Sequence, residues 1–453
     1  MSLLSSLDRE HIVAEPGFSR WLVPPAALCV HLCIGQAYAF SVFNLPMTRL
    51  IGITAPAPDD WKLTQLGWIF SIAIVMLGVS SAVAGSWLDR VGPRKAMLLA
   101  ASCFGGGFLV AAFGVAVHQL WLVYLGYGVL GGCGLGIGYI SPVKTLITWF
   151  PDRPGMATGM AIMGFGGGAM IASPLSVWLM RQFSTATHVG VAEAFVVLAV
   201  VYFCFMAVGS AIVRVPAAGW QPAGYVPRAR TGKLITTENV TLERAVRTPQ
   251  FVLLWLVLCL NVTAGIGVLG QASAMIQETF AGRITPVAAA GFVGLLSLFN
   301  MGGRFLWASV SDYIGRKATY CVFFLLGIAL YAAVPSAAHI HSVALFVACY
   351  CIILSMYGGG FATIPAYLKD VFGVQFVGAI HGRLLTAWSA AGVLGPVLVN
   401  YISDYQINHG VARADSYSFT MYIMAALLVL GLICNLLMYP VRERHIDMEG
   451  ARA

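Results

Sequence analysis

One face of a predicted helix combines polar side chains with a single arginine. Ser297, Asn300, Arg304, Trp307 and Ser311 recur at steps of three and four residues in an otherwise apolar segment, and this spacing places them on one side of a helix. The guanidinium of Arg304 is permanently charged, and its planar fork of N–H donors matches the two oxygens of a carboxylate. The stripe therefore indicates an anion-binding site.

The sequence places no acid in the same apolar layer as Arg304. None of the eighteen Asp and Glu residues falls in the middle of an apolar segment, and the nearest lie at segment ends: Glu193, Glu278, Asp312 and Asp370. Burying a guanidinium without a counter-ion costs several kcal/mol, so we expect a bound anion to supply the negative charge. The alternative is that Arg304 binds backbone carbonyl groups or extends toward the membrane surface.

The helix that carries Arg304 is one of many apolar segments. The 453 residues are 59% hydrophobic and only 10% charged, which indicates an integral membrane protein. Twelve segments are long enough to span a bilayer as helices. They lie near residues 20–47, 63–88, 96–116, 119–149, 155–181, 190–214, 250–279, 286–311, 317–335, 340–368, 375–402 and 416–440. The predicted fold is therefore all-α, with twelve transmembrane helices arranged as two six-helix halves.

Basic residues between the spans predict the orientation, because basic loops stay in the cytoplasm. One side, the basic side, holds Arg90, Arg94, Lys95, Arg153, Arg228, Arg230, Lys233, Arg244, Arg247, Arg316, Lys317, Arg442 and Arg444. The other holds Arg49, Lys62, Arg181, Arg283 and Arg413. We therefore expect a multi-pass protein of the plasma (inner) membrane with both termini in the cytoplasm. This asymmetry and contact with anionic lipid account for the net charge of +8 without a nucleic-acid partner.

The longest polar interruption divides the chain into two halves. We predict a cytoplasmic tail at 1–19, a first six-helix bundle at 20–214, a cytoplasmic linker at 215–247, a second six-helix bundle at 248–440 and a cytoplasmic tail at 441–453. The linker contains "TLERAVR", where a short helix is expected.

The two halves repeat one short motif. "GSWLDRVGPRK" follows the second span and "ASVSDYIGRK" follows the eighth, and such a duplication is common in secondary transporters. Asp89 and Asp312 are the matching acids. They can accept hydrogen bonds from the N-termini of facing helices or pair with Arg90, Arg94 or Arg316. We expect these contacts to latch one conformational state, although ordinary surface ion pairs are the alternative.

These loops resemble the signature loop of the major facilitator superfamily. "GQAYAFSVFNLP", "WFPDRPGMATGMAIMGFGGG", "SLFNMGGRFLWASVSDYIGRK" and "YGGGFATIPAYLKDVFG" are similar to segments of its oxalate/formate antiporter family, whose relatives include monocarboxylate carriers. The resemblance runs from about residue 20 to residue 440. It implies exchange or uptake of small carboxylate anions by alternating access.

The resemblance also assigns individual positions. Arg304 aligns with a substrate-binding arginine of the family. Dicarboxylate exchange there also uses a lysine in a stretch resembling "TAKG", where this chain has "TAWS", so Trp388 stands at the lysine position. A single cation favours a monocarboxylate such as formate, lactate or pyruvate over oxalate. Lys144 or Arg383 could supply a second cation, but Lys144 lies within reach of the cytoplasmic surface and Arg383 is turned away from Trp388.

Further candidates for substrate contact come from matching family positions: Tyr38, Tyr139, Phe165, Gln271, Tyr357 and Phe361. Aromatic residues in such helices more often serve packing. Asn300 stands where proton-coupled relatives have an aspartate, and it cannot titrate, so we expect exchange or gradient-driven uptake. His31 could still carry a proton.

Several other functions find no support in the sequence. It shows no catalytic triad, metal-ligand cluster or nucleotide-binding motif, so we predict neither an enzyme nor a cofactor. "LGGCGLGIG" and "GFGGGAM" lack the ending of a phosphate-binding loop and favour close helix contact instead. The remaining rivals are a transporter of another small anion, such as nitrate or nitrite, and a carboxylate-binding membrane sensor. We expect a monomer in the lipid bilayer.

Overall fold

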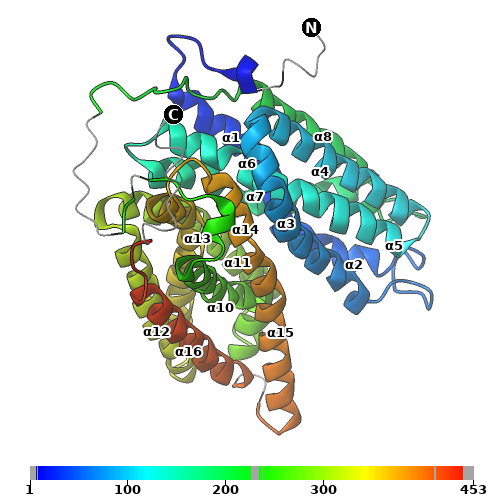
Figure 1. Ribbon diagram of the computed structural model, residues 1–453. Coiled ribbons are helices and arrows are strands. Elements are labelled where there is room, and N and C mark those ends of the chain that lie inside the picture. The colour runs from blue at the N-terminus through cyan, green and yellow to red at the C-terminus, as the bar shows by residue number, and fades with distance from the viewer. Residues whose placement is uncertain (1–6, 8, 226–233, 237, 413–414, 442–453) are drawn as a thin grey trace. The chain divides into compact units, whose positions relative to one another are not determined.

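The computed structural model describes residues 7, 9–225, 234–236, 238–412 and 415–441, which form helices joined by turns and loops (Figure 1). The predicted tail residues 1–6, 8 and 442–453 and the linker residues 226–233 and 237 lie outside it. Within the described ranges, β pairing is confined to one isolated parallel bridge between Val13 and Val215.

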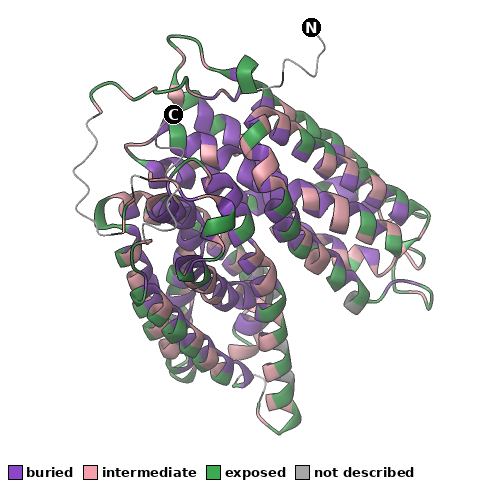
Figure 2. Cartoon of the chain, viewed as in Figure 1, coloured by how far each residue is buried: buried purple, intermediate pink, exposed green. Residues whose placement is uncertain are grey.

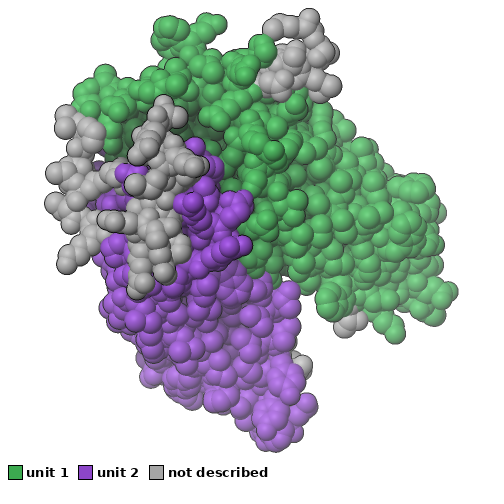
Figure 3. Space-filling model, in the orientation of Figure 1, with its two compact units in different colours: residues 1–152, 160–225, 378–389 green, residues 153–159, 226–377, 390–453 purple. Residues whose placement is uncertain are grey.

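The chain divides into two compact units, which Figure 3 colours separately. Unit 1 comprises residues 1–152, 160–225 and 378–389, and unit 2 comprises residues 153–159, 226–377 and 390–453. In the predicted bundles, residues 153–159 fall in the first half and residues 378–389 in the second. Each unit therefore takes one short segment from the other half of the sequence.

The first half of the chain forms a series of helices. They are η2 (Arg9–Ile12), η3 (Arg20–Leu22), α1 (Val23–Ile34), η4 (Gly35–Phe43), α2 (Asn44–Met47), α3 (Leu63–Val91), α4 (Pro93–Ala116), α5 (Leu120–Val123), η5 (Tyr124–Gly131), α6 (Gly132–Trp149), α7 (Pro154–Phe183) and α8 (Val191–Ile212). Two predicted spans are irregular. η4 is a 3₁₀ stretch in the first span, and η5 is a π-helical stretch in the fourth.

The second half of the chain is also built from helices. Its helices are α9 (Leu242–Ala245), α10 (Pro249–Thr279), α11 (Pro286–Ile314), α12 (Arg316–His339), α13 (Val343–Phe372), α14 (Val377–Leu384), α15 (Thr386–Asn408) and α16 (Ser416–Leu436). α9 confirms the short helix expected in "TLERAVR". The eleventh predicted span is broken between α14 and α15.

Hydroxyl side chains begin three of the long helices in the second half. Thr248, Thr285 and Ser342 precede α10, α11 and α13, and each accepts a hydrogen bond from the backbone N–H three residues later. Such caps satisfy an N–H group that has no partner within the helix. The sequence thus encodes where these helices begin.

Eleven helical segments among the described residues are long and apolar enough to cross a membrane. α11, which carries Asn300 and Arg304, is not one of them and occupies the remaining position of the twelve predicted spans. Large apolar side chains stay exposed along the outer helices, as Val200 and Val208 do on α8, and Figure 2 shows exposed residues along α12 and α16. Such faces suit contact with lipid.

Small residues let helices approach closely. In unit 2, a Cβ added at Gly303 of α11 would overlap the carbonyl oxygen of Ser355 of α13. In unit 1, a Cβ at Gly134 of α6 would lie 2.6 Å from the backbone nitrogen of Phe104, and one at Gly168 of α7 would lie 2.8 Å from the Cα of Gly35. The glycine-rich stretches predicted to mediate helix contact do so.

The neighbouring glycines of α11 provide a stability test. We expect Gly303→Ala to destabilise the folded protein by about 1–3 kcal/mol, because the added methyl group overlaps a backbone atom. Gly302→Ala is the matched control, since a Cβ there meets nothing within 4 Å and alanine favours a helix by roughly 1 kcal/mol. Thermal unfolding in detergent measures both; equal unfolding temperatures for the two variants would contradict the packing argument.

Candidate functional site

Arg304 lies in the interior of unit 2, in the middle of α11, and its side chain is 0% exposed. Its Nε donates a hydrogen bond of 3.2 Å to Oδ1 of Asn300, one helical turn earlier. Asn300 is itself buried. Because the amide is neutral, this bond orients the guanidinium without cancelling its charge.

α13 supplies an aromatic surface beside this arginine. The Cζ of Arg304 lies 5.1 Å from the centre of the Phe361 ring, and Tyr357 packs edge-on against Phe361 with ring centres 5.3 Å apart. Gly358 lies between them in sequence, and a Cβ there would overlap the carbonyl oxygen of Asn300. A cation over an aromatic face gains about 2 kcal/mol in a desolvated site, so this surface holds the charge in place.

The rest of the predicted polar stripe has other partners. Trp307 donates from Nε1 to Oγ of Ser355 over 3.1 Å, and Ser297 donates to the carbonyl oxygen of Val293. These two residues therefore support the helices around Arg304. Gln271, also predicted, lies on α10 and is partly exposed.

Four of the predicted aromatic residues form one cluster in unit 1. Trp388 lies at its centre, with its ring 5.2 Å from Phe165, 5.3 Å from Tyr139 and 6.4 Å from Tyr38. Tyr38 and Tyr139 each also pack against Phe165. Tyr38 comes from the 3₁₀ stretch η4, whereas Phe165 and Trp388 come from α7 and α15. Apart from Gln271, the predicted substrate contacts thus form two groups, an aromatic cluster in unit 1 and the Arg304 group in unit 2.

Two histidines adjoin the aromatic cluster. The ring of His31, predicted as a possible proton site, lies 5.4 Å from that of Tyr139, and Nδ1 of His31 is 3.1 Å from the carbonyl oxygen of Ala27. His381 lies 6.0 Å from Tyr139 and was not predicted. No spacing along a single helix marks it, because His381 lies in α14 whereas Trp388 lies in α15.

Asp312 binds the start of another helix within unit 2. Its carboxylate accepts hydrogen bonds from the backbone N–H groups of Gly155 (3.0 Å) and Met156 (2.9 Å), in the first turn of α7. Arg316 pairs with the same carboxylate and also with Asp370. A carboxylate at a helix N-terminus satisfies N–H groups that lack partners and meets the positive end of the helix dipole.

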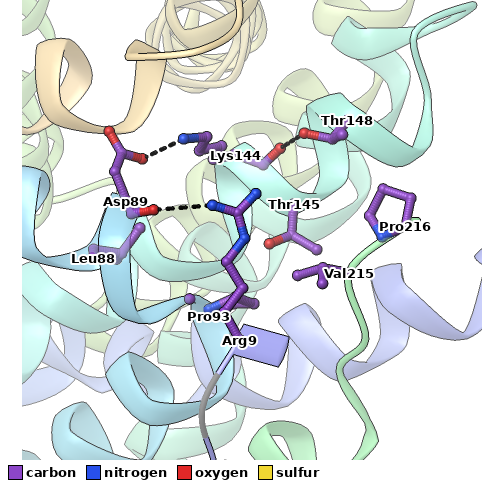
Figure 4. A pocket seen from close by; sticks show the side chains of 10 residues that line it. Arg9, Leu88, Asp89, Pro93, Lys144, Thr145, Thr148, Val215 and Pro216 are labelled. Carbon is purple, nitrogen blue, oxygen red and sulfur yellow. Dashed lines mark hydrogen bonds and ion pairs between the residues drawn. The ribbon is translucent and has the colours of Figure 1, made fainter. Parts of the chain in front are cut away.

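Asp89 does the same in unit 1, and Figure 4 shows its pairing with Lys144. One carboxylate oxygen accepts a 3.2 Å hydrogen bond from the N–H of Ala379, in the first turn of α14, and the other pairs with Nζ of Lys144 at 2.8 Å. Both acids therefore contact the first turn of a helix from the opposite half of the sequence, and each carries one basic partner. Lys144, predicted to reach the membrane surface or a substrate, instead binds the repeated motif.

An N-terminal segment covers this motif. Nη1 of Arg9 donates to the carbonyl oxygen of Asp89 over 3.3 Å, and the N–H groups of Ala14 and Val215 bond across the bridge to Val215 and Ile12. A cavity of about 60 Å³ lies among Arg9, Asp89 and Lys144. This segment ties the first repeated loop to the residues that follow α8.

The two repeated motifs share one backbone feature. Gly92, directly after α3, has a φ of 87°, and Gly315, directly after α11, has a φ of 88°. Both glycines follow their acid by three residues, and a residue with a side chain rarely adopts this conformation. The two motifs are therefore alike in backbone conformation as well as in sequence.

The other predicted basic residues lie elsewhere. Arg94 donates to the carbonyl oxygens of Ser210, Ala211 and Val213 at the end of α8. Arg90 and Arg383 are exposed. We expected Arg90 or Arg94 to pair with Asp89. The partner is instead Lys144, which comes from a helix distant in sequence.

The comparisons with known proteins agree with this architecture. The family model described as "Major Facilitator Superfamily" matches residues 26–396. The chain belongs to this superfamily. It is 27% identical over 378 residues to the oxalate:formate antiporter of Oxalobacter formigenes, with 83% of each chain covered. It is 25% identical to apicoplast pyruvate carrier 1 of Toxoplasma gondii, with 92% of this chain and 88% of that one covered.

A solved structure shares the fold. The fucose:proton symporter FucP of Escherichia coli superposes with a TM-score of 0.65 at 14% identity, covering 92% of this chain and 99% of that one. The predicted all-α transporter fold is confirmed. The protein is a multi-pass membrane transporter of this superfamily rather than an enzyme, and its relatives indicate small organic anions as substrates.

The helix caps lead to a test of local stability. We expect Asp312→Asn to speed hydrogen exchange of the Gly155 and Met156 amides, and Asp89→Asn to speed that of Ala379, because a charge-assisted bond contributes about 1.5–3 kcal/mol. Asp59→Asn, in an exposed loop, is the control. Mass spectrometry of the α7 and α14 peptides measures the effect. Unchanged exchange in both would show that the carboxylates do not hold these helices.

Proposed function

We propose that the protein exchanges small monocarboxylates such as formate, lactate or pyruvate across the membrane by alternating access. The observation that carries this proposal is the environment of Arg304. A permanent cation, wholly buried in the middle of a membrane helix, is oriented by a neutral amide and an aromatic ring. Charges at such a depth serve function rather than packing, and the fork of donors suits a carboxylate.

The choice of a monocarboxylate rests on Trp388. In the oxalate/formate antiporters that this chain resembles, dicarboxylate exchange uses a lysine at this position. Here the indole of Trp388 packs among Phe165, Tyr139 and Tyr38 instead. An aromatic cluster favours the apolar part of a small anion and offers no second charge. Of the two other candidate cations, Lys144 pairs with Asp89 and Arg383 is exposed. Both observations support a substrate with one carboxylate.

The two capping acids provide the proposed conformational latch. Residues 153–159 pack with unit 2, yet they continue into the part of α7 that belongs to unit 1. Residues 378–389 pack with unit 1, yet they continue into α15 of unit 2. A rearrangement that separates residues 153–159 from unit 2 and residues 378–389 from unit 1 must break the hydrogen bonds of Asp312 to α7 and of Asp89 to α14. We propose that these bonds stabilise one access state.

Several further properties complete the proposal. Asn300 cannot take up a proton, which supports exchange over carboxylate-gated proton symport. We propose that the protein lies in the plasma (inner) membrane as a monomer surrounded by lipid, with both termini and the basic side in the cytoplasm.

Two substitutions test whether the charge and the planar shape of the Arg304 side chain are needed for transport. Arg304→Gln should abolish counterflow of labelled pyruvate in proteoliposomes, because the anion loses its cation. Arg304→Lys should recover little, because an ammonium does not copy the planar fork. Arg283→Gln, at an exposed arginine, is the matched control, and gel filtration checks folding. Wild-type counterflow in a folded Arg304→Gln protein would refute the role of Arg304.

Trp388 is tested by competition. In the wild type, formate, lactate and pyruvate should compete with labelled substrate better than oxalate does, because a second carboxylate in a low-dielectric site without a cation costs several kcal/mol. Trp388→Lys should shift the preference toward oxalate, although losing the indole lowers the overall rate. Nitrate belongs in the same panel. If oxalate or nitrate competes best in the wild type, the monocarboxylate assignment is wrong.

A further inference from the structure

His381 is a buried titratable residue that the proposed transport cycle does not yet use. It lies in α14 and is 1% exposed. Neither of its ring nitrogens has a hydrogen-bond partner among the residues that the structure describes. A neutral imidazole carries one donor and one acceptor, so this environment leaves both unsatisfied and is unfavourable even without a charge.

The helices around His381 belong to unit 1 and pack closely. A Cβ at Gly382 would overlap the carbonyl oxygen of Ser81 on α3, and one at Gly85 of α3 would lie 2.8 Å from the Cα of Ala379. Tyr139 of α6 lies beside the imidazole, with ring centres 6.0 Å apart. α14 is therefore held against α3 by backbone contacts and lies against α6 through the ring of Tyr139.

The ionisable groups of the surrounding helices offer His381 little compensation. From α3, Asp89 already accepts bonds from Ala379 and Lys144, and Lys144, from α6, adds a positive charge. From α1, His31 adjoins the same tyrosine ring, and a charge on one imidazole disfavours a charge on the other. From α14 itself, Arg383 is exposed and also positive. A proton on His381 is therefore poorly compatible with the packed position of α14.

We propose that His381 is a proton-binding site, and that a proton bound there is incompatible with the packing of α14 against α3 and α6. When α14 separates from these helices, the imidazole gains water and binds a proton with ordinary affinity. Protons on the basic side therefore favour the open state of that side. This inference rests on the proposed alternating-access function, which requires α14 to separate, and adds a regulatory ligand to it.

The direction of the pH effect follows from linkage. The packed state binds no proton at His381, and the separated state binds one, so lowering the pH stabilises the separated state. The proton enters and leaves from the same side of the membrane, so none is carried across. A proton gate of this kind is compatible with anion exchange.

Hydrogen exchange of α14 tests the proposal without depending on transport. In purified wild-type protein, protection of the α14 amides, corrected for intrinsic rates, should fall about tenfold from about pH 7.5 to about pH 5.5, given an ordinary histidine pKa in the separated state. His381→Gln should abolish this slope, and His381→Phe, which also fills the space, should do the same if the glutamine variant fails to fold.

Matched variants locate the effect. His409→Gln, at an exposed histidine beyond α15, should keep the wild-type slope. His31→Gln should also keep a slope that begins at the same pH, because the separated state sets the pH at which His381 takes up its proton. A slope that persists in the His381 variants, one that disappears with His31→Gln instead, or no slope in the wild type would overturn the proposal.

Counterflow of pyruvate, whose carboxylate stays ionised in this range, separates this inference from the proposed function. If counterflow occurs at about pH 7.5 but the exchange slope is absent, the proton site fails and the transport proposal stands. If the slope is present but no carboxylate exchanges at any pH, the proposed substrate class fails while His381 still binds the proton.

Discussion

A charge within a bilayer is costly unless hydrogen-bond acceptors, an opposite charge or water compensate it. This constraint governs where the charged side chains of the protein lie. The ion pairs of Lys144 with Asp89, Arg316 with Asp312 and Arg20 with Asp152 all lie near helix ends next to the basic loops. Arg304 is different, because it lies in the middle of α11 beside an amide and an aromatic ring. The buried position of Arg304 is the observation on which the proposed anion site rests.

The same constraint explains the role of the two repeated acids. The first N–H groups of a membrane helix must find acceptors, and Asp89 and Asp312 supply them to α14 and α7. Each acid reaches a helix from the other half of the sequence, and the segments it contacts, residues 153–159 and 378–389, belong to the same compact unit as that acid. Helix capping, which is usually local, here connects the halves of a duplicated chain.

Much of this arrangement could be predicted from the sequence, because periodicity and charge are local signals. The stripe around Arg304, the matching acids and the glycine contacts all depend on spacing along one helix. The pairing of Lys144 with Asp89 and the burial of His381 could not be predicted, since both depend on which helices meet. The 3₁₀ stretch that carries Tyr38 was also missed, because its apolar composition resembles that of an ordinary helix.

Three contacts of the segment 378–389 would couple substrate binding, proton binding and helix capping. Ala379 is capped by Asp89, His381 is packed beside Tyr139, and Trp388 lies in the aromatic cluster, all within one short stretch of unit 1. Separation of this segment from α3 and α6 would disturb all three together. A ligand shifts such an equilibrium only by its different affinity for the two states. Substrate contact with Trp388, a proton on His381 and the cap at Ala379 would therefore act on the same equilibrium, and each would alter the apparent strength of the others.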